Sequence, residues 1–118
     1  MPRKVVLYVL LSVVGVAGLS VAQAEKGKAS FYHDKFQGRS TACGQAFNQK
    51  KLTAAHKKLP CGTKVKVTRR DTGKSVIVTV NDRGPFVAGR IIDLSKAAAR
   101  KLGFVKRGIA PVRLTVLH

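Results

Sequence analysis

Short segments in which apolar and polar residues alternate recur in the second half of the chain, and they restrict its fold more than any other feature. Residues 63–68 place valines between lysines, residues 75–80 place a valine at every second position, and residues 112–117 alternate again. A period of two is typical of strands with one buried face. Because the turn sequence RDTG at residues 70–73 separates the first two segments, they predict a β-hairpin.

Further patterns add two strands and a loop. We expect strands at residues 28–32 and 90–92. Residues 33–49 are polar and contain glycine, which predicts a long loop held by the inward packing of Phe36 and Phe47. About five short strands with one helix indicate a small barrel that is mainly β.

Residues 94–102 predict the helix. Apolar residues at positions 94, 97, 98 and 102 recur with the spacing of one helical face, and Gly103 follows as a stop signal. Either Asp93 or Ser95 is expected to cap the N-terminus, because both side chains accept backbone N–H bonds. A capping role for Asp93 competes with a catalytic one.

The start of the chain predicts export. A basic start is followed by an uncharged apolar run at residues 5–22 and by Ala22-Gln23-Ala24, the small-x-small pattern of a signal-peptidase site. We predict a signal peptide at residues 1–24 and a mature domain at residues 25–118. The alternative is a retained anchor, since such a run is just long enough to cross a bilayer. No lipobox cysteine follows the run, so a soluble periplasmic monomer is expected.

The predicted mature domain is strongly basic. Only Arg3 and Lys4 of the 23 Lys and Arg residues precede residue 25, and all five acidic residues follow it, which gives the domain a formal charge of +16. Such a charge favours polyanions, and export favours those of the cell envelope, including its anionic surfaces. The chain has no Trp, and its basic residues are not interleaved with aromatic ones, so no nucleic-acid binding is expected.

Cys43 and Cys61 are the two cysteines of the sequence. An even number of cysteines in an exported chain predicts a disulfide, because the compartment is oxidising. The alternative is a pair of buried free thiols.

The stretch Val80–Ser95 (VNDRGPFVAGRIIDLS) contains two of the five acidic residues, Asp82 and Asp93. In a chain so poor in carboxylates, each of them is either a structural group or a functional acid. The structural alternative for Asp82 is a turn or an ion pair with Arg83. The lone His56 fits a structural role as well as a catalytic one. The Cys and His spacing matches no metal site, and no metal or cofactor is expected.

Six motifs in sequence order resemble the RlpA-like (rare lipoprotein A) domain family. They are ASFY at 29–32, TACG at 41–44, LTAAH at 52–56, LPCGT at 59–63, NDRGPF at 81–86 and GRIIDLS at 89–95. The resemblance extends over residues 27–117. It implies a six-stranded double-psi β-barrel, related to expansins, with a role on bacterial peptidoglycan.

Catalytic members of this family are lytic transglycosylases, which cut glycan strands between N-acetylmuramic acid and N-acetylglucosamine and leave a 1,6-anhydro end. They prefer strands without stem peptides. The resemblance implies that Asp93 donates a proton to the glycosidic oxygen and then accepts one from the C6 hydroxyl, with Asp82 in the same groove. It implies that His56 is a hydrogen-bonding partner. The substrate-binding residues that it implies are Gln45, Arg83, Arg90, Tyr32 and Thr41.

The chain departs from the family pattern at Gln45, where many members have a glutamate. The lipoprotein cysteine and the peptidoglycan-binding repeat domain of some members have no counterpart in these 118 residues. Two functions therefore stay open. One is a lytic transglycosylase of peptidoglycan glycan strands, favoured by Asp82, Asp93 and His56. The other is a non-catalytic peptidoglycan-binding or expansin-like wall-loosening module, favoured by Gln45 because an amide does not ionise.

Overall fold

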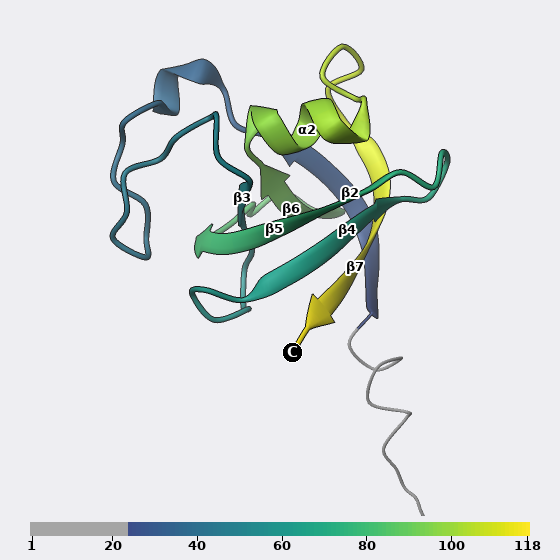
Figure 1. Ribbon diagram of the computed structural model, residues 1–118, viewed down its shortest axis with the longest axis horizontal. Helices are drawn as coiled ribbons and strands as arrows, with labels where there is room; N and C mark the ends of the chain where they lie inside the picture. The colour runs from purple at the N-terminus through teal and green to yellow at the C-terminus, as the bar shows by residue number, and fades with distance from the viewer. Residues whose placement is uncertain (1–23) are drawn as a thin grey trace, which may run out of the picture.

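Six strands pair edge to edge and close on themselves in the computed structural model, which describes residues 24–118 (Figure 1). Apart from Ala24, the predicted signal peptide lies outside the described residues. Among residues 24–118, no helix is long and apolar enough to cross a membrane. The elements are β2 (Ala24–Phe31), the 3-10 helix η2 (Asp34–Phe36), β3 (Thr53–Ala55), β4 (Lys64–Arg69), β5 (Ser75–Asp82), β6 (Arg90–Leu94), α2 (Lys96–Leu102) and β7 (Ala110–Leu117).

The strands follow one another around the barrel in the order β2, β6, β3, β5, β4, β7. Strands β4 and β5 form the predicted antiparallel hairpin, while β2 pairs with β6 and β3 pairs with β5 in parallel. The prediction of a small, mainly β barrel with one short helix is therefore confirmed. All six strands of the closed barrel lie within residues 24–118.

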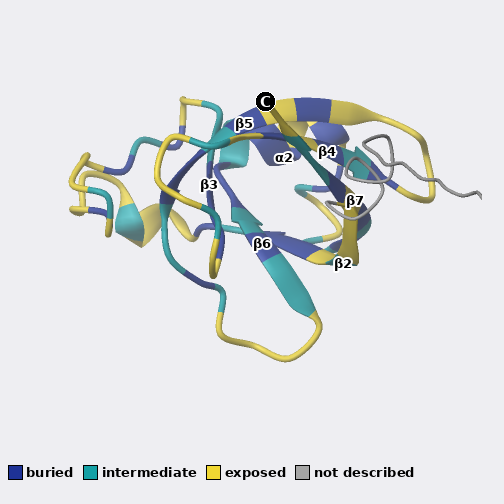
Figure 2. Ribbon diagram, turned by 90° about the horizontal axis from the view of Figure 1, so that it is seen from below, coloured by how far each residue is buried: buried dark blue, intermediate teal, exposed yellow. Residues whose placement is uncertain are grey.

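The core of the barrel is built by the alternating segments. Valines at positions 65, 67, 76, 78 and 80 point inward, and at most 7% of each side chain is exposed. Ile92, Leu94 and Leu114 join them from β6 and β7. Each fully buried side chain of this size contributes about 1.5–3 kcal/mol. Figure 2 shows buried residues along the strands and exposed residues mainly on the connecting loops.

The helix α2 begins after Ser95, whose side chain accepts a hydrogen bond from the backbone N–H of Ala98. Gly103 ends it in the left-handed conformation (φ 76°), where a glycine has no steric cost. Asp93 lies inside β6 and does not cap the helix. Of the two predicted caps, the structure selects Ser95, so the predicted capping role of Asp93 is wrong.

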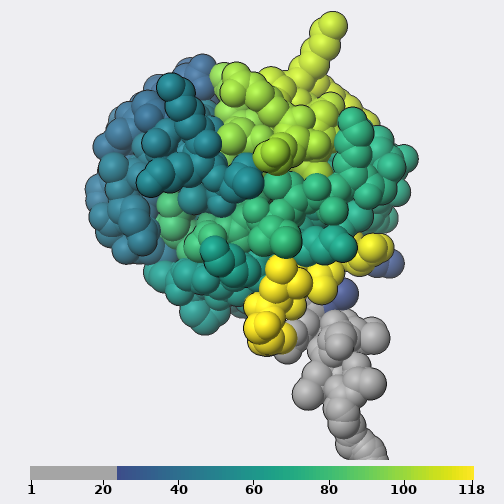
Figure 3. Space-filling model, in the orientation of Figure 1, coloured from purple at the N-terminus to yellow at the C-terminus, as the bar shows by residue number. Residues whose placement is uncertain are grey.

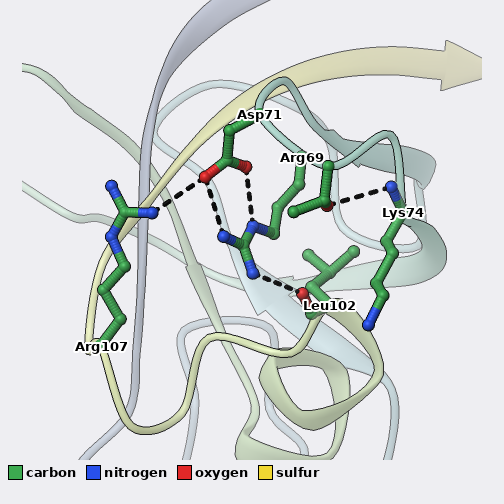
Figure 4. A network of polar contacts seen from close by, with 6 residues as sticks. Arg69, Asp71, Lys74, Leu102 and Arg107 are labelled. Carbon is green, nitrogen blue, oxygen red and sulfur yellow. Dashed lines mark hydrogen bonds and ion pairs between the residues drawn. The ribbon is translucent and has the colours of Figure 1, made fainter.

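A polar network fastens the β4–β5 turn to the end of the helix (Figure 4). The guanidinium group of Arg69, which is buried, donates to both carboxylate oxygens of Asp71 at 2.8 and 2.9 Å and to the carbonyl of Leu102 at 3.0 Å. Arg107 also donates to Asp71. The pKa of Asp71 is held well below its ordinary value, chiefly by Arg69. This carboxylate has a structural role.

Candidate functional site

The five carboxylates of the chain separate into two groups. In the first group, Glu25, Asp34 and Asp71 each have a carboxylate oxygen 2.8–2.9 Å from a side-chain nitrogen of a histidine, lysine or arginine. In the described part of the chain, Asp82 and Asp93 form no ion pair, and both line one cavity. Scarce carboxylates without a balancing cation are candidates for chemistry.

Strand pairing explains why these two aspartates meet. The short strand β3 lies between β5 and β6, and its Ala55 is the register partner of both Asp82 on β5 and Asp93 on β6. Adjacent strands lie about 4.8 Å apart, so the two aspartate backbones are separated by roughly 10 Å across the alanine. The methyl group of Ala55 leaves the space between them open.

The cavity has a volume of about 320 Å³ and lies outside the barrel wall, against the loop of residues 33–49. Tyr32 stacks on Phe47 with a 4.1 Å separation of ring centroids and meets Phe36 edge to face. The predicted inward packing of Phe47 is confirmed, whereas Phe36 is only half-buried. The lining residues are Tyr32, Phe36, Arg39, Ser40, Thr41, Phe47, Ala55, Asp82, Arg83, Gly84, Pro85, Phe86 and Asp93.

The carboxylate of Asp82 is fixed by three donors. Its Oδ2 accepts the hydroxyl of Tyr32 at 2.6 Å, and its Oδ1 accepts the backbone N–H groups of Ala42 and Arg83 at 2.8 and 2.9 Å. Burial, followed by the hydrogen bond to Asp82, raises the pKa of Tyr32 far above its ordinary value, so Tyr32 stays a phenol donor. These three hydrogen bonds hold the carboxylate of Asp82 in one orientation.

The environment of Asp93 differs. Its Oδ1 accepts one side-chain hydrogen bond, from the hydroxyl of Ser30 at 3.1 Å. Burial raises the pKa of Asp93, and the negative charge of Asp82 adds to this, while Ser30 and Arg90 oppose it. A carboxyl with a raised pKa retains its proton to higher pH, as a general acid requires.

The structure places His56 outside the cavity lining. Its Nδ1 accepts the backbone N–H groups of Lys58 and Leu59, and its Nε2 lies 2.9 Å from the carboxylate of Glu25. Because Nδ1 accepts two hydrogen bonds, the ring proton is on Nε2, which donates a hydrogen bond to the carboxylate of Glu25. His56 is 5% exposed and contacts neither aspartate side chain. It orders the loop that follows β3.

Three of the five predicted substrate-binding residues line the cavity, and two do not. Arg90, the first residue of β6, is not in the cavity lining, although its charge opposes the rise in the pKa of Asp93. Tyr32, Thr41 and Arg83 line the cavity. The guanidinium group of Arg83 donates to the carbonyls of residues 56, 59 and 82 and makes no ion pair with Asp82. Gln45 is exposed and lines a separate hollow with Asn81 and Thr79, so the structure does not bring it to the aspartates.

The backbone of Thr41 and the disulfide hold the loop beside Asp82. The backbone N–H and the hydroxyl of Thr41 both donate to the carbonyl of Gln45. Cys43 and Cys61 form the predicted disulfide, with Cα atoms 5.9 Å apart. No group of three or more His, Cys, Asp or Glu side chains within residues 24–118 is arranged to hold a metal ion.

Sequence reasoning missed two residues of the site. Ser30 reaches Asp93 only through the parallel register of β2 and β6, which pairs the two residues directly. Phe86 lies at the mouth of the cavity with 79% of its side chain exposed. An exposed aromatic ring beside a cavity suits the apolar face of a sugar. The motif NDRGPF contains this residue, but no local pattern indicates that its ring faces solvent.

The family model described as "Lytic transglycolase" matches residues 24–114. The chain is 54% identical over 95 residues to the endolytic peptidoglycan transglycosylase RlpA of Pasteurella multocida, covering 80% of this chain and 32% of that protein. It is 56% identical over 93 residues to the protein of that name from Vibrio cholerae, covering 79% and 35%. The chain thus spans about a third of the length of these relatives.

Two solved structures share the fold. The Streptomyces papain inhibitor superimposes with a TM-score of 0.67 at 27% identity, covering 81% of this chain and 96% of that one. The expansin of Clavibacter michiganensis gives a TM-score of 0.63 at 27% identity, covering 80% and 50%. With the six motifs in order, the closed barrel and the matched family model, the chain belongs to the RlpA-like lytic transglycolase family of double-psi β-barrels.

Proposed function

We propose that this domain is an endolytic lytic transglycosylase that cleaves the glycan strands of peptidoglycan. The observation that carries the proposal is the pairing of Asp93, a half-buried carboxyl with a raised pKa, with the hydrogen-bonded carboxylate of Asp82 in one cavity. The names of the RlpA relatives support the choice of substrate.

In the first step, the protonated carboxyl of Asp93 transfers its proton to the glycosidic oxygen. The bond between this oxygen and C1 of N-acetylmuramic acid breaks, and its electron pair leaves with N-acetylglucosamine. Positive charge develops at C1 and the ring oxygen. The carboxylate of Asp82 faces the same cavity and stabilises that charge, because Tyr32 and two backbone N–H groups already hold it in place.

In the second step, the same residue acts as a base. The Asp93 carboxylate takes the proton of the C6 hydroxyl, and the O6 atom closes on C1 to give the 1,6-anhydro ring. Asp93 ends in its starting protonation state, and no water is consumed. A single half-buried carboxyl beside a fixed carboxylate is therefore sufficient for both steps.

The location and partners of the domain follow from its charge and its N-terminal sequence. We infer that it works in the periplasm as a soluble monomer after removal of residues 1–24. The formal charge of +16 on residues 25–118 draws it to the anionic components of the envelope.

The test is mass spectrometry of peptide-free glycan strands after incubation with residues 24–118. We expect 1,6-anhydro ends from the wild type and none from Asp93→Asn. Asp34→Asn is the matched control, because it makes the same substitution at an exposed carboxylate outside the cavity. Cleavage by Asp93→Asn at the wild-type rate would refute the assignment of the acid.

The second candidate is a wall-binding or wall-loosening module without catalysis. The amide side chain of Gln45 and the likeness to an expansin favour it. This function predicts strands that co-sediment with the protein and stay uncut. Gln45→Glu separates the two functions, since a gain of cleavage in that variant alone would show that the amide had disabled an enzyme.

A further inference from the structure

Five basic side chains share the outer face of three adjacent strands of the barrel. Strand alternation directs Lys26 and Lys28 of β2, Lys64 and Lys66 of β4, and Arg113 of β7 away from the core, and all five are exposed. We call these five residues the basic face.

The basic face has no acidic counterpart among the described residues. The carboxylate closest to it in sequence belongs to Glu25, which alternation turns away from Lys26 and which bonds His56. The other four acids lie in the loop after β2, in the β4–β5 turn and at the cavity. The outward positions of β2, β4 and β7 therefore carry only positive charge.

Strand register brings these charges together. Lys26 on β2 is the direct register partner of Arg113 on β7. Lys66 on the other neighbouring strand, β4, pairs with Thr115, two residues from Arg113. Like charges placed opposite each other destabilise a sheet. Barrel stability does not account for the basic face, whereas an anionic partner that neutralises it does.

The strand at the centre of the basic face, β7, lies on the opposite side of the barrel from the cavity, whereas Lys28 on β2 is two positions from Ser30, which donates to Asp93. In the six-strand order, β7 is three strands away from β3, which forms the floor of the cavity. Figure 1 shows the loop of residues 33–49 on one side and β7 on the other, and Figure 3 shows the same separation on the surface. Both surfaces can therefore be occupied at once, and a glycan strand in the cavity does not need the basic face.

Apolar side chains border the lysines. Ile77, the register partner of Lys66, is 51% exposed, and Leu117, the partner of Lys64, is 37% exposed. Lysines interleaved with exposed aliphatic residues are typical of surfaces that lie in the headgroup region of a bilayer. A soluble polyanion would contact the charges but would leave these apolar groups in water.

We propose that the basic face docks on an anionic phospholipid surface, with the cavity directed away from the bilayer toward the substrate. Because β7 lies between β2 and β4, the long side chains of Lys and Arg on all three strands can reach the phosphates of one headgroup layer. Each Lys or Arg near such a surface strengthens binding by about fivefold. Loss of three of them should weaken binding by roughly a hundredfold.

The experiment is co-sedimentation of residues 24–118 with vesicles of phosphatidylcholine alone or with about one third phosphatidylglycerol, at low and high salt. The test variant is Lys26→Gln/Lys66→Gln/Arg113→Gln. Its matched control removes the same charge from exposed loop residues that lie off the basic face. The control variant is Lys50→Gln/Lys57→Gln/Lys106→Gln.

We expect salt-sensitive binding to the anionic vesicles only, a loss of about a hundredfold in the test variant, and a change of less than about threefold in the control. Circular dichroism checks that both variants fold. Equal losses in the two variants, or no binding of the wild type, would overturn the proposal. A test variant that loses binding to purified sacculi but keeps vesicle binding would overturn it too. Asp93→Asn should bind vesicles normally, so this result is separate from the proposed catalysis.

Discussion

Removal of the disulfide tests how the fold holds the site together. Cys43 and Cys61 are separated by 18 positions in sequence. On the chain-entropy model, opening a loop of this size lowers the free energy of unfolding by about 3 kcal/mol. Neither cysteine is fully buried, so replacement with alanine removes little packing. For a domain of this length, the melting midpoint should fall by roughly 12–24 °C.

The disulfide also bears on the chemistry. Cys43 follows Ala42, whose backbone N–H donates to Oδ1 of Asp82, and its own N–H donates to the carbonyl of Asn81. Without the link to Cys61, the loop that carries this donor is held less firmly. A hydrogen bond to a charged group contributes about 1.5–3 kcal/mol. If the hydrogen bond from Ala42 to Asp82 is lost, Asp82 is held less well for stabilising the positive charge on the sugar. The rate of the proposed glycan cleavage should then fall by roughly tenfold or more.

Calorimetry and the glycan assay on Cys43→Ala/Cys61→Ala measure both effects. Leu102→Ala is the matched control, because truncation of a buried leucine costs about 2–5 kcal/mol and Leu102 is remote from the cavity lining. Assayed below both melting transitions, the control should cleave at the wild-type rate. The reasoning fails if the double variant melts within about 4 °C of the wild type, or if both variants lose activity equally.

Three further variants test the site. Burial favours the protonated form of Asp93 in the folded state. The free energy of unfolding is therefore not reduced by Asp93 below about pH 4, and it falls as the pH rises through the raised pKa of this residue. Asp93→Asn should therefore melt above the wild type at pH 7 and equal to it at pH 3, as thermal scans at both pH values would show. Asp82→Asn removes a charge that raises the pKa of Asp93, so the carboxyl carbon of Asp93 should titrate at lower pH by NMR; a rise or no change would contradict this. Phe86→Ala should raise KM for glycan by roughly two- to tenfold with kcat nearly unchanged. Ile77→Ala, at a residue that is also exposed but lies off the cavity, should change neither.

The parts of the fold that sequence predicted are those with local patterns. Strands β4, β5 and β7 and helix α2 lie within about two residues of the expected segments, because alternation, helical spacing and the stop at Gly103 are local. Strand β2 begins at Ala24, earlier than the expected residue 28, because pairing with β7 extends it over Glu25 and Gly27. The three-residue strand β3 has no period of its own and forms because β5 and β6 pair on its two sides.

The residues of the site were more predictable than the contacts between them, since the resemblance also named Tyr32, Thr41 and Arg83, which line the cavity. Scarcity and family resemblance selected Asp82 and Asp93, and the structure brings both to one cavity. The donors that distinguish them lie far away in sequence: Tyr32 is 50 positions from Asp82, and Ser30 is 63 positions from Asp93. No local pattern carries such contacts, because they depend on which strands pair and in which register.

The difference between the two aspartates follows from where each lies in the barrel. Asp82 ends β5, where the register shift opposite Ala55 and the adjoining loops bring three donors to one carboxylate. Asp93 lies within β6, where regular pairing occupies the backbone and leaves one hydroxyl within reach, that of Ser30. Burial without compensating donors raises a carboxyl pKa, and for Asp93 burial is the largest cause. A strand end thus holds a carboxylate in place and a strand interior raises the pKa of a carboxyl, so one barrel wall supplies both groups that the proposed transglycosylation needs.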